Sequence, residues 1–195
     1  MIKAKLTLLA MAVSCLVAEF GYADGSEWCG GYNWSYWAEN YVPVYGGVAV
    51  AGRNMISPAP TGMIEVPATL GGYPVAVLNH QAFAFNDSIT AVMIPASVKE
   101  IGQESFCGCA NLRTVIFLGD CPSVPNVENN ANADDGLVFY GTPEDLTVCV
   151  YEDARGWPSG NRWFGKKLVR RPRSSVGTKT WYDETTGLTW EYCLD

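Results

Sequence analysis

Residues 78–94 read LNHQAFAFNDSITAVMI and residues 101–117 read IGQESFCGCANLRTVIF, so the chain repeats itself at an offset of 23 residues. A half-repeat lies upstream, where residues 64–70 (IEVPATL) match residues 92–98 (VMIPASV). The apolar positions that coincide are Leu78 with Ile101, Phe83 with Phe106, Ile89 with Leu112, Val92 with Val115 and Ile94 with Phe117. A fixed period in the twenties predicts a repeat solenoid, in which each unit buries its apolar edge only against its neighbours.

Short parallel strands are expected within the repeats. Residues 92–94 and 114–117 are rich in β-branched side chains and are followed by Pro95 and, two residues on, Gly119. Residues 146–150 return to the same alternation and are expected to add the next strand. Between the strands, residues 103–107 are expected to form a turn or two of helix.

The strand period of two assigns the side chains of this sheet to two faces. The inward residues are expected to be Val92, Ile94, Val115 and Phe117, with Phe83 and Phe106 stacked as an aromatic ladder. The outward residues are expected to be Glu65, Met93, Ile116 and Cys149. An exposed pair of Met93 and Ile116 would form a small apolar patch of the kind that marks a contact site. Glu65, Met93 and Ile116 are therefore the candidate ligand-binding residues, unless the Trp-rich N-terminal segment covers them.

Aromatic residues crowd both ends of the repeat region, which we place at residues 59–171. Residues 24–58 contain Trp28, Tyr32, Trp34, Tyr36, Trp37, Tyr41 and Tyr45. A terminal unit has only one neighbour to pack on, so residues 24–58 are expected to be a capping segment. A carbohydrate-stacking platform is the alternative. Trp157 and Trp163 are expected to close the C-terminal end.

The tail, residues 172–195, opens with the linker-like sequence PRSS and then echoes the start of the chain. Residues 187–193 (GLTWEYC) match residues 31–37 (GYNWSYW) in Gly, Trp and Tyr at an offset of 156. We interpret the tail as a linker and the truncated start of a second module. A coincidental Trp-rich tail is the alternative.

The first 23 residues have the features of a signal peptide. Lys3 and Lys5 precede a short apolar run over residues 6–17, and the small residues Gly21 and Ala23 fit a cleavage site. The run is too short to span a bilayer. Residues 1–23 therefore predict a secreted or cell-surface protein with no membrane span after cleavage. A lipoprotein anchored at Cys15 is the alternative.

Charge argues against nucleic acid as a partner, because the chain carries a net charge of −7 and its long-range field repels phosphate. One local exception is a basic cluster of Lys166, Lys167, Arg170, Arg171 and Arg173. A solvated strand end is the simpler interpretation of this cluster, and a polyanion-binding patch is the other.

Cysteine usage fits an exported protein. Six cysteines follow the leader, Cys29, Cys107, Cys109, Cys121, Cys149 and Cys193, and their even number suggests disulfides whose pairing the sequence does not determine. Cys109 lies where the repeat needs a small core residue, so we expect a buried thiol there in preference to a bridge.

Neither a metal site nor a cofactor is expected. The CxC spacing of Cys107 and Cys109 is weak for zinc, and the one histidine of the chain, His80, lies in the preceding repeat. The Asn- and Asp-rich loop of residues 126–136 begins like a calcium loop, but its Gly136 is one place late and no Glu closes it. A solvated turn is expected there.

No catalytic residues are expected either. A pairing of the Cys107 thiol with His80 as its base can be imagined, but an oxidising compartment would tend to bridge an exposed thiol.

A resemblance to a known family adds to these expectations. Residues 94–106 (IPASVKEIGQESF) and the following residues 109–112 (CANL) resemble the BspA-like (treponemal-type) leucine-rich repeats of bacterial surface proteins, whose pattern is IPxSVxxIGxxAFxxCxxL. Residues 66–75 (VPATLGGYPV) look like the lead-in of such domains. Asn86 and Ser105 depart from the pattern. The resemblance implies a leucine-rich-repeat solenoid and an exported or cell-surface protein, with attachment to host or neighbouring proteins.

Two functions follow as hypotheses. The first is a non-catalytic module for protein–protein interaction or adhesion at the bacterial surface, with an extracellular or cell-surface protein as partner and a glycan as another possibility. The second is a structural spacer unit, or a truncated member, of a tandem-repeat envelope protein with no ligand of its own.

Overall fold

The structure, a computed structural model, describes residues 23–125, 137–173, 178–183 and 188–193. The predicted signal peptide, apart from Ala23, and the Asn- and Asp-rich loop of residues 126–136 lie outside the described residues.

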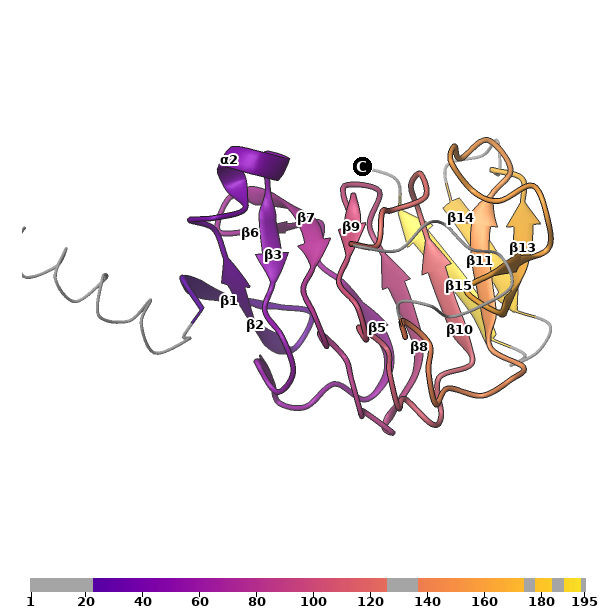
Figure 1. Ribbon diagram of the computed structural model, residues 1–195, viewed down its shortest axis with the longest axis horizontal. Helices are drawn as coiled ribbons and strands as arrows, with labels where there is room; N and C mark the ends of the chain where they lie inside the picture. Colours follow the sequence, from indigo (N-terminus) through magenta and orange to yellow (C-terminus); the bar gives the residue numbers. More distant parts are fainter. Residues whose placement is uncertain (1–22, 126–136, 174–177, 184–187, 194–195) are drawn as a thin grey trace, which may run out of the picture.

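Seven strands form the first sheet (Figure 1). They are β1 (Gly25–Cys29), β2 (Tyr32–Trp37), β3 (Val48–Val50), β4 (Ile56–Ser57), β6 (Thr69–Leu70), β7 (Tyr73–Leu78) and β9 (Glu100–Ile101). The order is β1-β2-β3-β7-β6, with β4 beside β2 and β9 beside β7. β3, β7 and β9 run parallel to one another, and the remaining pairs are antiparallel. A single-turn helix, α2 (Val42–Tyr45), lies between β2 and β3 in the chain.

The second sheet has six strands in the order β12-β13-β11-β10-β8-β5. They are β5 (Gly62–Glu65), β8 (Ile89–Ile94), β10 (Thr114–Phe117), β11 (Thr147–Tyr151), β12 (Arg162–Trp163) and β13 (Lys166–Arg171). All pairs are parallel except β12 with β13. Val92 pairs with Val115, and Val115 with Val148, so the predicted strands and their register are confirmed.

A separate hairpin ends the chain. β14 (Thr178–Asp183) and β15 (Leu188–Cys193) pair antiparallel with each other, and in the view of Figure 1 they overlap the C-terminal part of the second sheet.

The predicted fold class, a repeat solenoid of leucine-rich-repeat type with brief helices, is wrong. The described residues form two mixed sheets of parallel and antiparallel strands, and α2 is the one helix among them. The expected helix at residues 103–107 is a series of turns, because Glu104 and Gly108 have φ angles of 58° and 70° in the left-handed region. A right-handed helix cannot continue through such residues.

Three turns with the same backbone shape replace the expected helices. These turns, at residues 81–86, 104–109 and 137–142, lie one above another, and we call them the turn stack. Positive φ recurs at matched places, Gln81, Glu104 and Leu137, and again at Phe85, Gly108 and Gly141. Backbone N–H groups of each turn donate to carbonyls of the next: Phe83 to Ser105, Phe85 to Cys107, Phe106 to Val138, and Gly108 to Tyr140, at 2.7–3.0 Å. These bonds satisfy backbone groups that a helix would pair internally.

An aromatic row fills the core beside the turn stack. Phe83 and Phe106 are stacked with ring centroids 5.5 Å apart and planes 2° from parallel, which confirms the predicted ladder. Phe139 continues the row at 5.7 Å from Phe106. Trp34 contacts Phe83 at one end, and Trp163, fully buried, contacts Phe139 at the other. The predicted packing of Trp163 at the C-terminal end is thus confirmed.

Candidate functional site

The three predicted ligand-binding residues lie in one row but differ in exposure. Glu65 pairs with Met93 and Met93 with Ile116 in the parallel register of the second sheet. Glu65 is exposed, whereas Met93 and Ile116 are each only 1% exposed. The expectation of an exposed apolar patch is therefore wrong. A ligand-binding role for these residues stays a prediction, and it requires a rearrangement that uncovers Met93 and Ile116.

The Trp-rich N-terminal segment, which the sequence suggested as a cover for Met93 and Ile116, packs elsewhere. Met93 and Ile116 form a cluster with Ala91, Cys149 and Tyr151, and Leu118, Ala154 and Val169 pack against it. The N-terminal aromatic residues Trp37, Tyr41 and Tyr45 pack instead over Ala49, Ala76 and Val77 of the first sheet. Outward small residues on β3 and β7 leave room for the large rings, so these aromatic residues cover the sheet face beside them.

Hydrogen bonds hold this aromatic cover in place. The Tyr45 hydroxyl donates to the Glu100 carboxylate at 2.7 Å, and this bond raises the pKa of Tyr45 to about 12. The pKa of Tyr41 is also raised, first by burial and then by the negative charge of Glu100. The Tyr41 and Tyr45 rings stack on each other at 6.1 Å. A sugar-binding role for these rings stays a prediction.

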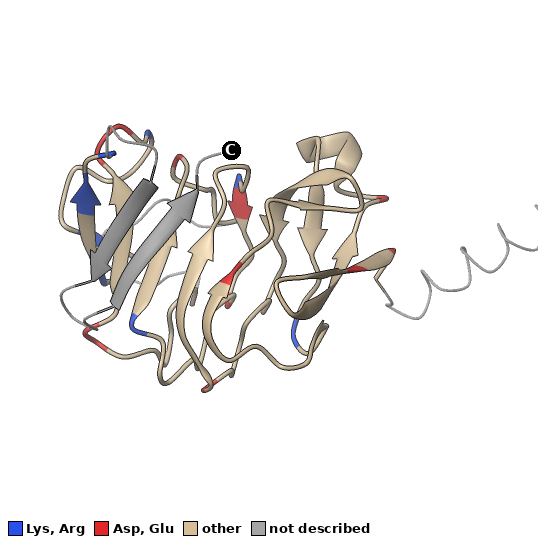
Figure 2. Cartoon of the chain, turned by 180° about the vertical axis from the view of Figure 1, so that it is seen from behind, with Lys and Arg blue, Asp and Glu red and all other residues tan. Residues whose placement is uncertain are grey.

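Most of the basic cluster lies on β13, which carries blue in Figure 2, and the side chains of Lys166, Arg170 and Arg173 are used by the fold itself. Lys166 Nζ donates to the carbonyls of Thr142 and Pro143, and the Arg170 guanidinium donates to those of Pro158 and Gly160. The Arg173 Nε donates to both oxygens of Asp153, and its guanidinium lies 4.1 Å from the centroid of the Tyr151 ring. Donors engaged in this way tie loops to the edge of the sheet and are less free for a polyanion.

Neither the imagined thiol site nor a metal cluster is assembled. Cys107 is buried while His80 is exposed, and the His80 imidazole faces Glu104 at 3.9 Å. Within the described ranges, no group of three His, Cys, Asp or Glu side chains could hold a metal ion.

Cys109 is the buried core thiol that the repeat predicted. It is fully buried, and its Sγ donates to the Phe83 carbonyl at 3.0 Å. Burial raises the pKa of the thiol to about 11, so it stays protonated and inert at neutral pH.

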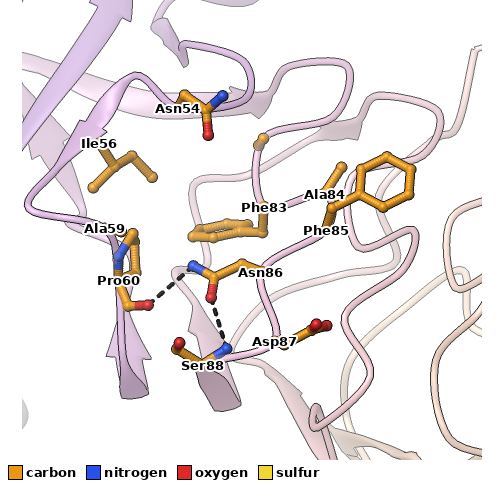
Figure 3. A pocket seen from close by; sticks show the side chains of 11 residues that line it. Asn54, Ile56, Ala59, Pro60, Phe83, Ala84, Phe85, Asn86, Asp87 and Ser88 are labelled. Carbon is orange, nitrogen blue, oxygen red and sulfur yellow. Dashed lines mark hydrogen bonds between the residues drawn. The ribbon is translucent and has the colours of Figure 1, made fainter.

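The N-terminal end of the turn stack, at its first turn, borders a hollow of about 360 Å³ that the sequence did not predict (Figure 3). It lies between the loop of residues 52–60 and the first turn of the turn stack. Apolar groups line its inner part, among them Ile56 and Phe83, which are buried. Polar side chains stand around it: Asn54, Asn86, Asp87 and Ser88. We call this site the Phe85 hollow, after the aromatic residue that also lines it. The lining is mixed, with apolar side chains inside and polar groups around them that could orient a bound molecule.

Phe85 is the unusual residue of the hollow. Its φ of 59° lies in the left-handed region, and the matched positions of the other two turns are both glycine, Gly108 and Gly141. Phe85 is 53% exposed, and its ring lies against Gly108, where an added Cβ would be 2.5 Å from the ring. The Arg53 guanidinium lies on the ring at 4.7 Å from its centroid. A bulky residue in this conformation stores backbone strain, which is characteristic of functional sites.

Two side chains fix the shape of the hollow. The Asn86 amide donates to the Pro60 carbonyl at 2.9 Å and accepts from the Ser88 N–H at 2.9 Å. Asp87 accepts from the Ala110 N–H at 3.1 Å through one carboxylate oxygen. The loop and the turn are thus held apart at a fixed spacing, and the exposed Asp87 carboxylate can accept further hydrogen bonds.

A signal for this site was present in the sequence. In the 23-residue alignment, Phe85 falls on Gly108 and Asn86 falls on Cys109, so both depart from the following repeat. A large aromatic residue in place of a turn glycine marks the position, but its exposure and its neighbour Arg53 follow only from the three-dimensional structure.

No described helix is long and apolar enough to cross a membrane.

Comparison with known proteins gives one distant likeness. No family model matches the chain, and no curated protein matches its sequence. Among solved structures, the chain is similar to a leucine-rich cell surface protein from Faecalibacterium prausnitzii A2-165, with 21% identity and a TM-score of 0.38. The match covers 67% of this chain and 46% of that protein, so the chain spans less than half of its length. A likeness of this size carries no argument about family or ligand, and the function is therefore derived from the chain's own residues.

Proposed function

We propose that the chain is an exported, non-catalytic binding protein that acts in protein–protein interaction or adhesion at the bacterial surface, with the Phe85 hollow as its recognition site. One observation carries the proposal: an exposed aromatic ring is held in a strained conformation at a position where both equivalent turns have glycine. Strain of about 1–2 kcal/mol is expected for such a residue. The other two turns keep the same backbone shape with glycine at this position, so a recognition role would explain why Phe85 bears this cost.

The surroundings of Phe85 support a binding role. Aromatic residues and arginine are each enriched where proteins recognise one another, and the Arg53 guanidinium lies on the Phe85 ring. Arg53 and Asp87 give this site one cation and one anion, so a partner can be oriented without a strong overall charge. The leader predicted from residues 1–23 supports an exported location.

A direct test is binding of the full chain to an array of extracellular proteins and glycans, with Phe85→Gly beside the wild type. Phe85→Gly removes the ring and relieves the strain, so the fold is expected to survive and binding to weaken at least tenfold. Tyr140→Ala is the matched control, because Tyr140 is an exposed aromatic residue on the third turn, 64% exposed against 53% for Phe85.

A spacer without a ligand is the second candidate function. The observation that favours it is the burial of Met93 and Ile116, which leaves no apolar patch at the place predicted for contact. A folded wild-type chain with no saturable partner on the array would support the spacer and reject the binding role.

A further inference from the structure

The turn stack has a direction. Its N–H groups point to the following turn and its carbonyls point to the preceding one, as shown by the bonds from Phe83 and Phe85 to the carbonyls of Ser105 and Cys107, at 2.8 and 2.7 Å. A ladder of this kind ends with unused acceptors at its first member, just as an edge strand does.

The first turn therefore presents two carbonyls to the Phe85 hollow. By the repeat, the carbonyls of Ala82 and Ala84 correspond to those of Ser105 and Cys107. Both alanines line the hollow, and within the described part of the chain no donor reaches either oxygen. Two acceptors, two residues apart, thus face the open end of the stack.

The loop of residues 52–60 runs alongside the first turn but donates no hydrogen bond to the carbonyls of Ala82 and Ala84. At one end, Gly52 lies so close to the turn that an added Cβ would be 3.0 Å from the His80 carbonyl. At the other end, the Asn86 amide donates to Pro60. Between the two contacts the loop stands away from the turn, and Figure 3 shows Ile56, Ala59 and Pro60 across the gap from Phe83 and Asn86.

We infer that the Phe85 hollow binds a short peptide segment of a partner protein, whose alternate backbone N–H groups donate to the carbonyls of Ala82 and Ala84. The inference rests on the proposed function and names the kind of partner. A peptide matches the site because N–H groups at positions i and i+2 have the spacing that Phe83 and Phe85 already use toward the next turn. Addition of a peptide to the open end of a backbone ladder is a recurring mode of recognition.

One side chain of the peptide enters the hollow. The interior offers apolar contact through Ile56 and Phe83, and the two backbone bonds fix which side chain points inward. Main-chain bonds then supply affinity, and this apolar interior supplies the preference for an aliphatic or aromatic residue.

The test starts from random linear peptides displayed on phage and selected on the full chain. Selected peptides are synthesised and their Kd measured by fluorescence anisotropy against the wild type and Ala59→Trp. Ala59 lies on the loop, is exposed and lines the hollow, so a Trp there fills the gap without entering the core. Binding is expected to weaken at least tenfold. Val44→Trp, at a 71% exposed residue of α2, is the matched control and is expected to bind like the wild type.

A scan by N-methylation tests the backbone bonds themselves. Each methyl removes one N–H donor, and the two amides that pair with Ala82 and Ala84 are expected to show a loss of about threefold to tenfold each, two residues apart. Failure to select any peptide, equal affinity for Ala59→Trp, or a scan without this spacing would each overturn the inference. A different outcome would also overturn the inference: no peptide is selected, but a glycan on the array binds the wild type and does not bind Ala59→Trp. The proposed binding function would still stand in that case.

Discussion

Two phenylalanines of the turn stack differ sharply in what surrounds them. Phe106 is fully buried between Phe83 and Phe139, whereas Phe85 is 53% exposed at a left-handed position. The first residue stabilises the fold through packing, and the second is strained. The substitutions Phe106→Ala and Phe85→Gly distinguish these two roles.

Phe106→Ala is expected to reduce the free energy of unfolding by about 3–5 kcal/mol, because it leaves a cavity in the middle of the aromatic row. Urea denaturation of the full chain measures the change. A loss below about 1 kcal/mol would show that the row contributes little to the core.

Phe85→Gly is expected to leave the free energy of unfolding unchanged or to raise it by up to about 1 kcal/mol. Glycine adopts positive φ without strain, and the gain is partly offset by the lost contact with Arg53, worth about 0.5–1 kcal/mol. The same denaturation experiment applies. A clear loss of stability would mean that the ring supports the fold, and the argument from strain would fail.

Cys109 predicts a pH dependence. The pKa of its thiol is raised from an ordinary value of 9.0 to about 11 in the folded chain, so the folded state favours the protonated form. The stability that this thiol contributes is complete below pH 9. It is lost as the pH rises to 11, by about 1.4 kcal/mol per pH unit at most. Stability measured from pH 8 to 11 should fall more steeply for the wild type than for Cys109→Ala, and parallel curves would contradict the burial of the thiol.

At the scale of elements, the 23-residue period predicted β8, β10 and their register because each strand alternates apolar residues at matching positions. Phe139 was not predicted, since residues 126–136 lengthen its repeat and its turn follows at an offset of 33 from Phe106. The predicted helix at residues 103–107 was wrong because local composition does not reveal the left-handed φ of Glu104. Exposure of Met93 was also wrong, since strand alternation separates two faces but does not say whether both are covered.

The orientation of β8 yields a further prediction. Met93→Asp is expected to destabilise the chain by at least about 3 kcal/mol, because it places a carboxylate in a buried apolar cluster. Met63→Asp on the neighbouring strand β5 is the matched control, since Met63 is 40% exposed, and a change below about 1 kcal/mol is expected. Thermal unfolding followed by circular dichroism compares the two variants. Equal stability would show that Met93 is accessible and would restore the predicted contact row.

For the described part of the molecule, the turn stack runs beside the two sheets, and the carbonyls of Ala82 and Ala84 in its first turn have no donor. The sequence predicted the repeat, the parallel strands and the aromatic ladder, all of which depend on periodic apolar residues. It did not predict the Phe85 hollow, which forms where the turn stack meets a non-repeating loop. Such a site forms where an element of the fold has no neighbour packed against it. The period of the sequence does not show where that happens.

The most direct measurement is the Kd of the partner found on the array, determined for the wild type and for Ala59→Trp side by side. Saturable binding to the wild type, at least tenfold weaker binding to Ala59→Trp and an unchanged free energy of unfolding are the expected results. Equal affinity of the two proteins would place recognition elsewhere on the molecule and contradict the assignment of the Phe85 hollow.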